Sequence, residues 1–380
     1  MVLENETLPV MGGYVDAPWA EGSEELPASE NFLFTPFHDD SNIATDLATG
    51  ILGGYNVETN PYLTAELGGG LQVTHHRRTY PYPEDIEAQA LCMLGVGANL
   101  IGYYMYHGGV NPEGKRSTLQ ESRETGYFND LPVKCYDFQT CIRESGKISE
   151  SYHKTRKLHT LINDFEEQLA VTEYVAPDVM PDGPEDMNTP RVSLRVDEES
   201  GSGFIFINNH QRKRHMAPIR DLTVTINLPD GRTTVVDGIN VASDDTAVIP
   251  FGLRFDKYTW LEATNASLLA KVGKYFFFYT SDDKGEVYFD FDEEESEDIF
   301  LLSKEEAEHA YHIGDKLYIT DRQLIEENGM VYVLTSTDCK IKVYDEEGKL
   351  KTVKVKASYG EVNEKYLHVD FDGARAAAYD

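Results

Sequence analysis

The sequence predicts an α/β region over residues 1–176, followed by all-β domains. Two segments carry the first prediction: 61–70 and 101–111 are apolar and aromatic runs that end in glycines, and a helical pattern follows each. Such runs are typical of parallel strands that open into loops at their carboxyl ends. After Pro177 the pattern changes to short strands separated by turn residues, which is typical of β-sandwiches.

The α/β region is predicted to alternate strands and helices. We expect strands at 61–67 and 99–106, with a helix between them that opens at Pro83. A second helix is expected over 148–170. The apolar stripes of the two helices are Ile86, Ala90, Leu91 and Leu94, and Leu158, Leu161, Ile162, Phe165 and Leu169. Because two strands cannot close a barrel, the pattern predicts only a portion of a (β/α)8 TIM barrel, with long loops in residues 1–60.

Two β-rich parts are expected after the change of pattern at Pro177: a β-sandwich over 185–270 and a second β-rich region over 271–380. Ser303 and Glu306 have the spacing of a capping box and predict a short helix over 303–310. The turn sequence 345–348 predicts a hairpin. The expected strands are 192–196, 203–207, 222–228, 233–236, 247–251, 274–280, 286–291, 316–319, 331–336, 340–344 and 351–356.

Composition limits the partners and the compartment. The 66 acidic and 34 basic residues give a net charge of −32, which disfavours binding to nucleic acid and to anionic membranes. No apolar stretch of about eighteen residues exists, so no membrane span is expected. The first ten residues lack the features of a signal peptide, which predicts a cytoplasmic location unless a longer protein precedes them.

The chain contains four cysteines, and none of them predicts a cofactor. Cys92 lies in an apolar helical pattern and is expected in the core. Cys135 and Cys141 are close in sequence, but no further ligands follow at the spacing of a zinc site. We therefore expect reduced thiols, no metal and no cofactor.

Residues suited to sugar chemistry follow the two strand segments. Glu66 ends the first segment, at the position where barrel enzymes place catalytic groups. Tyr104, Tyr106 and Asn111 lie in the second segment, and tyrosines stack on sugar faces and bond to hydroxyls. Tyr136 lies on the long loop that follows and could close over the site. Without further information, a structural role for Glu66 and space filling by the tyrosines are the alternatives.

Several motifs resemble those of one enzyme family. Tyr104-Met105-Tyr106-His107-Gly108-Gly109-Val110-Asn111 is similar to the tyrosine–methionine–aromatic–x–glycine–glycine–threonine–asparagine signature of glycoside hydrolase family 35, the β-galactosidases, although Val110 replaces the usual threonine. Thr64-Ala65-Glu66 resembles the segment of that family's nucleophile. The segments 136–139 and 12–19 also resemble loops of the family. The likeness covers about residues 8–170.

The resemblance implies a retaining β-galactosidase that acts on terminal β-galactosides of an oligosaccharide or polysaccharide. It assigns the nucleophile to Glu66 and sugar binding to Tyr104 and Tyr136. Its acid/base should be a Glu that follows an Asn on an earlier strand; Glu6 matches locally but lies only 60 residues before Glu66, too close for three βα units. We therefore expect the acid/base in a missing N-terminal barrel half, and a chain that is inactive alone.

Two alternatives remain open. The β domains could form a non-catalytic carbohydrate-binding module, with Phe255, Tyr258 and Trp260 as candidate stacking residues, although strand and core roles are the simpler explanation for these three. The substrate could also be a sugar other than galactose, because loop contacts set the sugar preference of related enzymes.

Overall fold

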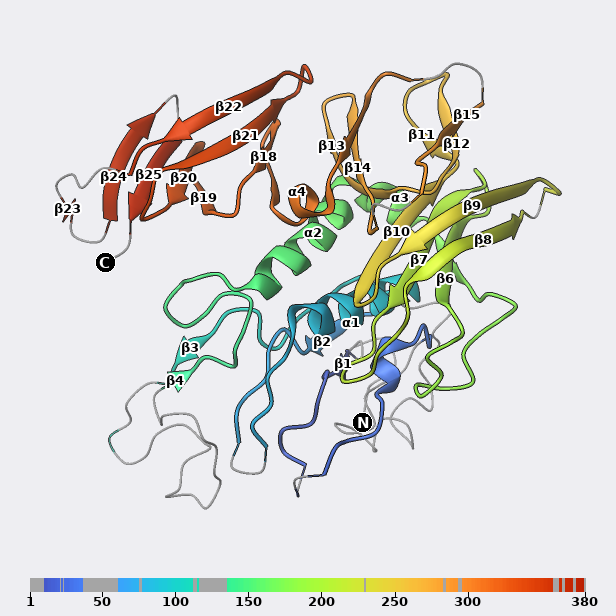
Figure 1. The fold of residues 1–380 in the computed structure, drawn as a ribbon, viewed down its shortest axis with the longest axis horizontal. Coiled ribbons are helices and arrows are strands. Elements are labelled where there is room, and N and C mark those ends of the chain that lie inside the picture. Colours follow the sequence, from blue (N-terminus) through green and yellow to red (C-terminus); the bar gives the residue numbers. More distant parts are fainter. Residues whose placement is uncertain are drawn as a thin grey trace. The chain divides into compact units, whose positions relative to one another are not determined.

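The computed structural model describes residues 10–20, 22, 24–36, 61–74, 77–111, 115, 135–228, 230–282, 285–292 and 296–357, and the backbone of three C-terminal strands. Within these residues the protein is rich in β-strands, which form small sheets, and contains four α-helices (Figure 1). Close packing divides the chain into two units. Unit 1 comprises 1–155, 167–267 and 281–292, and unit 2 comprises 156–166, 268–280 and 293–380. These bounds do not coincide with the three predicted domains, which stay a prediction.

Unit 1 begins with parallel pairing among short segments. Strand β1 (Met11–Gly13) pairs in parallel with β2 (Thr64–Leu67), within the strand predicted at 61–67. The strand predicted at 99–106 is present only as isolated parallel bridges, from Leu63 to Leu100 and from Leu67 to Tyr103. The Gly102 amide donates to the hydroxyl of Thr64 on β2 at 3.0 Å, which interrupts the ladder of backbone bonds.

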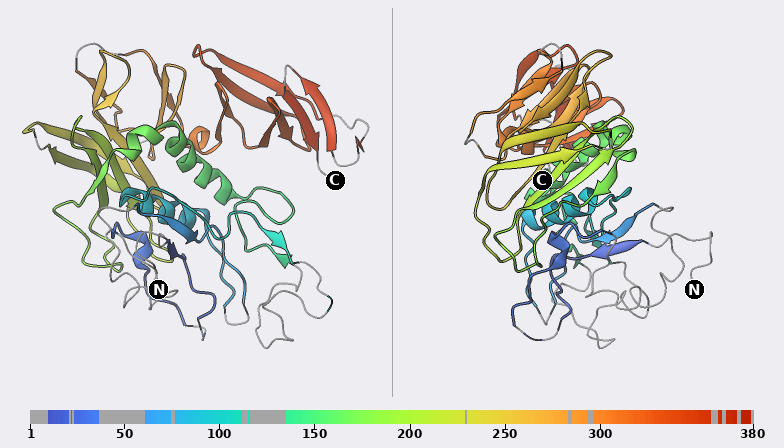
Figure 2. Two further views of the ribbon diagram at one scale, coloured as in Figure 1. Left: turned by 180° about the vertical axis from the view of Figure 1, so that it is seen from behind. Right: turned by 90° about the vertical axis from the view of Figure 1, so that its right-hand side faces the viewer.

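Helix α1 (Pro83–Gly95) is buried on all sides, although the sequence predicted one apolar face. Its first turn is closed by the Asp85 carboxylate, which accepts from the Tyr82 amide at 2.8 Å. Polar Glu87 and Gln89 are as inaccessible as the apolar stripe. Strands β6, β7 and β10 of the following sheet pack against one side of α1, as Figures 1 and 2 show, and Glu87 pairs with Lys154 at 3.6 Å.

The helix predicted over 148–170 is present as two helices, α2 (Glu150–Asp164) and α3 (Glu166–Ala170). Four of the five predicted stripe residues are buried, and Ile162 is half-buried: the buried ones are Leu158, Leu161, Phe165 and Leu169. The predicted stripe is therefore largely confirmed, and the break between the helices falls at Phe165.

The predicted sandwich is built from a four-stranded antiparallel sheet and a long hairpin. The sheet has the order β10-β7-β6-β5, and the hairpin is β8-β9. Inward side chains of both layers form one apolar core, including Ile205, Ile249 and Val236. The bounds are β5 (Glu173–Val175), β6 (Arg191–Asp197), β7 (Ser202–Asn209), β8 (Ile219–Asn227), β9 (Thr233–Val241) and β10 (Asp245–Phe251).

The other face of this sheet is polar where it meets the helices. Arg195 is 2% exposed and donates to the carbonyls of Leu94 and Leu169, near the ends of α1 and α3, at 3.1 and 2.7 Å. A guanidinium there satisfies carbonyls that have no partner within the helix and complements two helix dipoles. Burial lowers the Arg195 pKa to about 10. Arg195 of β6 thus connects α1 and α3 to this sheet.

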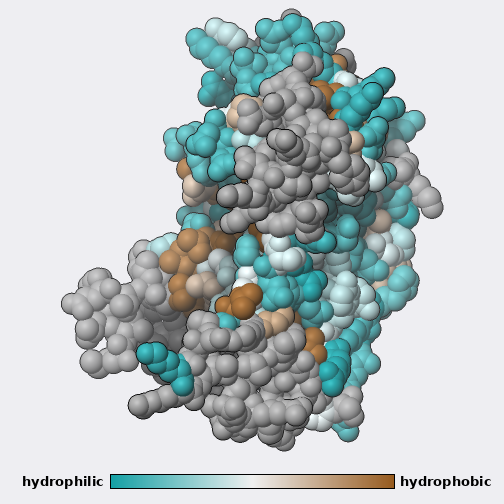
Figure 3. All heavy atoms as spheres, turned by 90° about the vertical axis from the view of Figure 1, so that its left-hand side faces the viewer, coloured by the Kyte–Doolittle hydropathy of each residue, from teal (hydrophilic) through white to brown (hydrophobic). Residues whose placement is uncertain are grey.

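A further sheet of unit 1 has the order β11-β12-β15, with β11 (Leu253–Arg254), β12 (Trp260–Thr264) and β15 (Phe289–Phe291). Two short elements complete the unit beside the loops: the 3-10 helix η1 (Glu30–Phe32) and the pair β3 (Gly109–Val110) and β4 (Cys135–Tyr136). Large hydrophobic side chains are exposed at Leu100 and Val110, by 49 and 64%. Figure 3 shows one face of the molecule on which hydrophobic atoms reach the surface among hydrophilic ones.

Unit 2 contains residues 156–166, which include the C-terminal part of α2, together with three small sheets and helix α4 (Lys304–Glu308). Ser303 and Glu306 form the predicted capping box, and Gly348, with a φ of 73°, closes the predicted hairpin turn. The remaining strands are β13 (Ser267–Val272), β14 (Tyr275–Tyr279), β16 (Ile299–Leu302), β17 (Ala310–Ile313), β18 (Lys316–Ile319), β19 (Gln323–Glu327), β20 (Met330–Leu334), β21 (Cys339–Asp345), β22 (Leu350–Val355), β23 (Val362–Asn363), β24 (Tyr366–Phe371) and β25 (Ala374–Ala378).

No helix in the described part of the chain is long and apolar enough to cross a membrane.

Candidate active site

Glu66 stands at the end of β2, where the parallel segments give way to loops. It lies opposite Gly12 in the register of β1 and β2, and its side chain is exposed. The Tyr14 hydroxyl, just beyond β1, donates to Glu66 Oε1 at 3.0 Å. One carboxylate oxygen is therefore held by a tyrosine that is itself 6% exposed. This arrangement orients the carboxylate and leaves Oε2 for other chemistry.

Tyr14 was not among the residues singled out for chemistry from the sequence. Burial raises the pKa of its hydroxyl well above the usual range, and the charge of Glu66 and the hydrogen bond to it raise it further. Tyr14 is therefore a neutral donor throughout the working range of most enzymes. The only sequence signal for this role is its place in the segment 12–19, which resembles a loop of family 35.

Two further tyrosines, Tyr104 and Tyr136, lie close to Glu66 and Tyr14. The hydroxyls of Tyr104 and Tyr136 are 2.9 Å apart, and both rings pack against Phe138. Both side chains also raise the pKa of Tyr14, so they belong to one cluster with it and Glu66. The structure thus brings together three of the five predicted site residues.

The glycines after Glu66 allow a close approach of neighbouring groups to the backbone. None of Gly68, Gly69 and Gly70 has a positive φ. A Cβ on Gly68 would lie 2.8 Å from the Tyr14 ring, and one on Gly70 would lie 2.3 Å from the Phe138 carbonyl oxygen. Small residues are needed here because the ring and the neighbouring loop approach the backbone closely.

The loop that carries Tyr136 is fixed by its own polar residues. Asp137 accepts from Arg143 Nε at 2.6 Å and from the Glu144 amide at 2.8 Å. Burial alone would raise the pKa of Asp137, but the hydrogen bonds from Arg143 and the Glu144 amide, together with the charge of Arg143, outweigh burial and lower it. Gln139 donates to the carbonyls of Leu71 and Thr79 at 3.0 and 2.9 Å, which ties the loop to the segment after β2. Phe138 and Gln139 both have positive φ, near 55°, an uncommon backbone geometry that these contacts maintain.

The two other predicted residues are placed differently. The Tyr106 hydroxyl lies 3.4 Å from Thr155 Oγ1 in α2, and its ring neighbours Tyr103 and Tyr152. Regular strand alternation would have placed Tyr103 and Tyr106 on opposite faces, but this segment forms no regular strand. Tyr106 therefore faces α2 rather than Tyr136. Asn111 directly follows β3, which pairs with β4 and Tyr136.

A buried charge network supports the loop on which Tyr14 lies. Asp16, two residues further on, accepts from Arg212 Nη2 at 2.9 Å and from Lys213 at 3.1 Å. Arg212 also binds Asp85 at the start of α1. His210 Nε2 lies 2.8 Å from Asp85, and its Nδ1 lies 2.9 Å from Asp244. No local sequence pattern predicts this network, because its members are up to 197 positions apart.

His210 is cationic at neutral pH in this setting. Burial by itself would lower its pKa, but the hydrogen bonds to Asp244 and Asp85 outweigh burial and raise it to about 9. The imidazolium then carries a proton on both ring nitrogens, one for each carboxylate. The loop with Tyr14 is therefore anchored by ionised groups in which each charge has an opposite partner.

Among the described residues, no three His, Cys, Asp or Glu side chains gather as they would around a metal ion. All four cysteines are free thiols in this structure, and Cys92 is buried as predicted. Glu6 lies outside the described residues, so its rejection as the acid/base stays a prediction. No protein-family model matches the chain, and a comparison with curated proteins finds no match.

Proposed function

We propose that the chain carries the nucleophile half of a retaining β-galactosidase site similar to that of glycoside hydrolase family 35. The observation that carries the proposal is the cluster of Glu66, Tyr14, Tyr104 and Tyr136, in which an oriented, exposed carboxylate meets a pair of tyrosine hydroxyls. Glu66 and the two tyrosines of the pair lie in the segments that resemble the family's nucleophile and galactose contacts.

The fold proposed for this half-site is the C-terminal part of a (β/α)8 barrel. Its support is the run of parallel partners, from β1 to β2, from Leu63 to Leu100, and from His107 to Ile142. Helix α1 connects β2 to the segment that begins near Leu100, as in a βαβ unit. In barrels the carboxyl ends of such strands form the active-site face, and Glu66 and Tyr104 lie at these ends.

In the proposed reaction Glu66 Oε2 attacks the anomeric carbon, and the bond from that carbon to the leaving oxygen breaks. The product is a galactosyl ester of Glu66, which water then hydrolyses to release galactose with retained configuration. Tyr14 holds the other carboxylate oxygen during both steps. Tyr104 and Tyr136 offer hydroxyls and ring faces to the sugar.

A retaining site also needs a second carboxyl group about 5–5.5 Å from the nucleophile, which protonates the leaving oxygen. The proposal assigns this role to none of the described residues. Acid catalysis of this type contributes about 10²–10⁴-fold. We therefore expect the chain alone to act on galactosides only where the leaving group departs without a proton.

Aryl galactosides with different leaving groups test this directly. The purified chain should release dinitrophenol from 2,4-dinitrophenyl β-galactoside, and added azide should yield galactosyl azide by attack on the Glu66 ester. Lactose should not be hydrolysed. Glu66→Gln should abolish the release, whereas Glu173→Gln, at an exposed position in β5, should not change it. Release that is unchanged in Glu66→Gln would overturn the proposed nucleophile. Lactose hydrolysis that depends on Glu66 would instead show that the acid/base is within this chain.

A further inference from the structure

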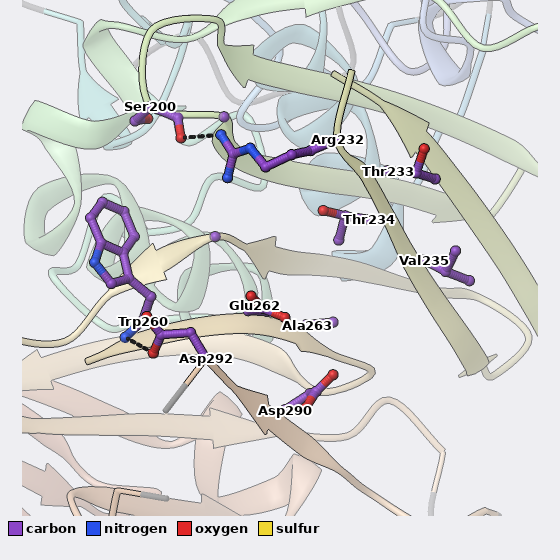
Figure 4. Close-up of a pocket in the computed structure, with 12 residues that line it drawn as sticks. Ser200, Arg232, Thr233, Thr234, Val235, Trp260, Glu262, Ala263, Asp290 and Asp292 are labelled. Atoms are coloured by element: carbon purple, nitrogen blue, oxygen red, sulfur yellow. Dashed lines mark hydrogen bonds between the residues drawn. The ribbon is translucent and has the colours of Figure 1, made fainter. Parts of the chain in front are cut away.

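A hollow in unit 1 lies away from Glu66, between the hairpin β8-β9 and the sheet β11-β12-β15. Its volume is about 580 Å³, within the range of about 300–1,000 Å³ that is usual for small-molecule sites. Figure 4 shows Trp260 and Arg232 with Glu262 and Asp290 on the neighbouring strands. The lining residues that the argument uses are Arg232, Thr233, Trp260, Glu262, Asp290 and Asp292.

Trp260 separates this hollow from a second one. The second has a volume of about 260 Å³ and shares Ser200, Gly252 and Trp260 with the first. Because the same indole ring lines both hollows, the two together form one groove. The guanidinium of Arg254, which lines the second hollow, lies 5.5 Å from the centre of the Trp260 ring and supports its orientation.

The polar groups of the groove are partly fixed in advance. Arg232 is held by Asp230 at 2.6 Å and by the Ser200 carbonyl at 3.1 Å (Figure 4). Asp292 accepts from the Trp260 amide at 3.0 Å, which sets the carboxylate beside the indole. The carboxylates of Glu262 and Asp290 form no hydrogen bond or ion pair with any residue that the structure describes. They are therefore available as acceptors for a ligand.

We propose that this groove binds a neutral oligosaccharide as an auxiliary site. A half-exposed indole offers an apolar face to a sugar ring, and carboxylates beside a guanidinium and a hydroxyl bind sugar hydroxyls as acceptors and donors. Three carboxylates disfavour an anionic ligand, and Arg232 disfavours a purely cationic one. The mixture of both charges with an aromatic face fits an uncharged ligand with many hydroxyls.

The structure separates the three aromatic residues that the sequence proposed for sugar stacking. Phe255 is 9% exposed and packs edge-on against Phe291, as a core residue does. Tyr258 is 71% exposed in the turn before β12 and does not line either hollow. Only Trp260 lies in the groove, so the proposal rests on this residue. It does not depend on the proposed galactosidase activity.

The two tryptophans of the chain make the test specific, because Trp19 packs against Tyr14 at the candidate active site and Trp260 lies in the groove. A Trp19→Phe variant leaves Trp260 as the only indole, and a Trp260→Phe variant leaves Trp19. Titration with lactose and with β-1,4-galactotetraose should change the emission of the Trp19→Phe protein. The change should persist when Glu66→Gln is added.

Calorimetry on the full chain measures the affinity itself. Trp260→Ala should weaken binding of the tetrasaccharide by about tenfold, the loss expected for an aromatic stacking contact. Arg232→Ala combined with Asp290→Asn should also weaken it and does not touch the indole, so it tests the groove if Trp260→Ala fails to fold. The proposal is overturned if neither variant changes the affinity, if Glu66→Gln abolishes binding, or if the wild-type chain binds neither sugar. Loss of binding in Glu66→Gln alone would locate the sugar at the candidate active site instead.

Discussion

The buried histidine of unit 1 predicts a measurable pH dependence of stability. His210 is sandwiched between Asp85 and Asp244, and its pKa is raised from 6.5 to about 9 by its hydrogen bonds to these carboxylates, against the effect of burial. A raised pKa means that the folded state binds the proton more tightly than the unfolded state does. The stabilisation is therefore complete below about pH 6.5 and is lost as the pH rises through about 9.

The magnitude follows from the same pKa values. Moving the pKa from 6.5 to about 9 corresponds to about 3 kcal/mol, at about 1.4 kcal/mol for each pH unit. The His210–Asp85 pair is buried and little screened by solvent, whereas Asp244 is 51% exposed, so about 3 kcal/mol is an upper value. We therefore expect the free energy of unfolding of unit 1 to fall by up to about 3 kcal/mol between pH 6 and pH 10.

Urea denaturation followed by tryptophan fluorescence provides the assay, because both tryptophans lie in unit 1. The wild-type chain should show the decline with pH, and His210→Gln should show lower stability at pH 6 with most of the decline removed. His309→Gln, in unit 2, is the matched control and should keep the wild-type slope. A decline of the same size in His210→Gln would refute the reasoning, since the proton would then reside on another group.

Three further predictions follow from the contacts around the site. Tyr14→Phe removes the donor to Glu66 and should slow galactosylation of Glu66 by about tenfold to a hundredfold, without loss of stability, in a stopped-flow assay of dinitrophenol release; an unchanged rate would remove Tyr14 from the account. Gly70→Ala places a Cβ 2.3 Å from the Phe138 carbonyl and should weaken galactoside binding by at least about tenfold, whereas Gly109→Ala, whose added Cβ meets no atom within 4 Å, should bind normally; equal affinities in calorimetry would contradict this reading of the glycines. Arg195→Leu removes the guanidinium that donates to buried carbonyls of α1 and α3 and should lower the free energy of unfolding by at least about 3 kcal/mol in urea, an expectation that a loss below 1 kcal/mol would contradict.

Short-range features of the fold could be predicted from the sequence. The capping box of Ser303 and Glu306 and the hairpin turn at Gly348 depend on residues a few positions apart, and both are confirmed. The same holds for Glu66, whose place at the end of an apolar run is visible in the sequence and is confirmed by β2. In each of these cases the decisive interactions are local.

Features that depend on distant packing could not be predicted. Helix α1 was predicted to have one apolar stripe, but it is buried on all sides because a sheet formed by residues 173–251 packs against it and Glu87 pairs with Lys154. The partner of Glu66 is Tyr14, 52 positions away, and no pattern in the sequence links the two. Tyr106 was predicted to contact a sugar, but it faces Thr155 of α2, and the Thr64 hydroxyl interrupts the regular pairing of its segment. Each miss arises because a contact from outside the local window decides the outcome.

Mass spectrometry of a trapped sugar tests the central claim most directly. The chain is incubated with 2,4-dinitrophenyl 2-deoxy-2-fluoro-β-galactoside, whose fluorine slows hydrolysis of the ester and whose leaving group needs no acid. The account predicts one fluorogalactosyl group per chain, on the peptide that contains Glu66, and none in Glu66→Gln. A label on any other residue, or an unlabelled wild-type chain, would contradict the assignment of Glu66 as the nucleophile of a galactoside site.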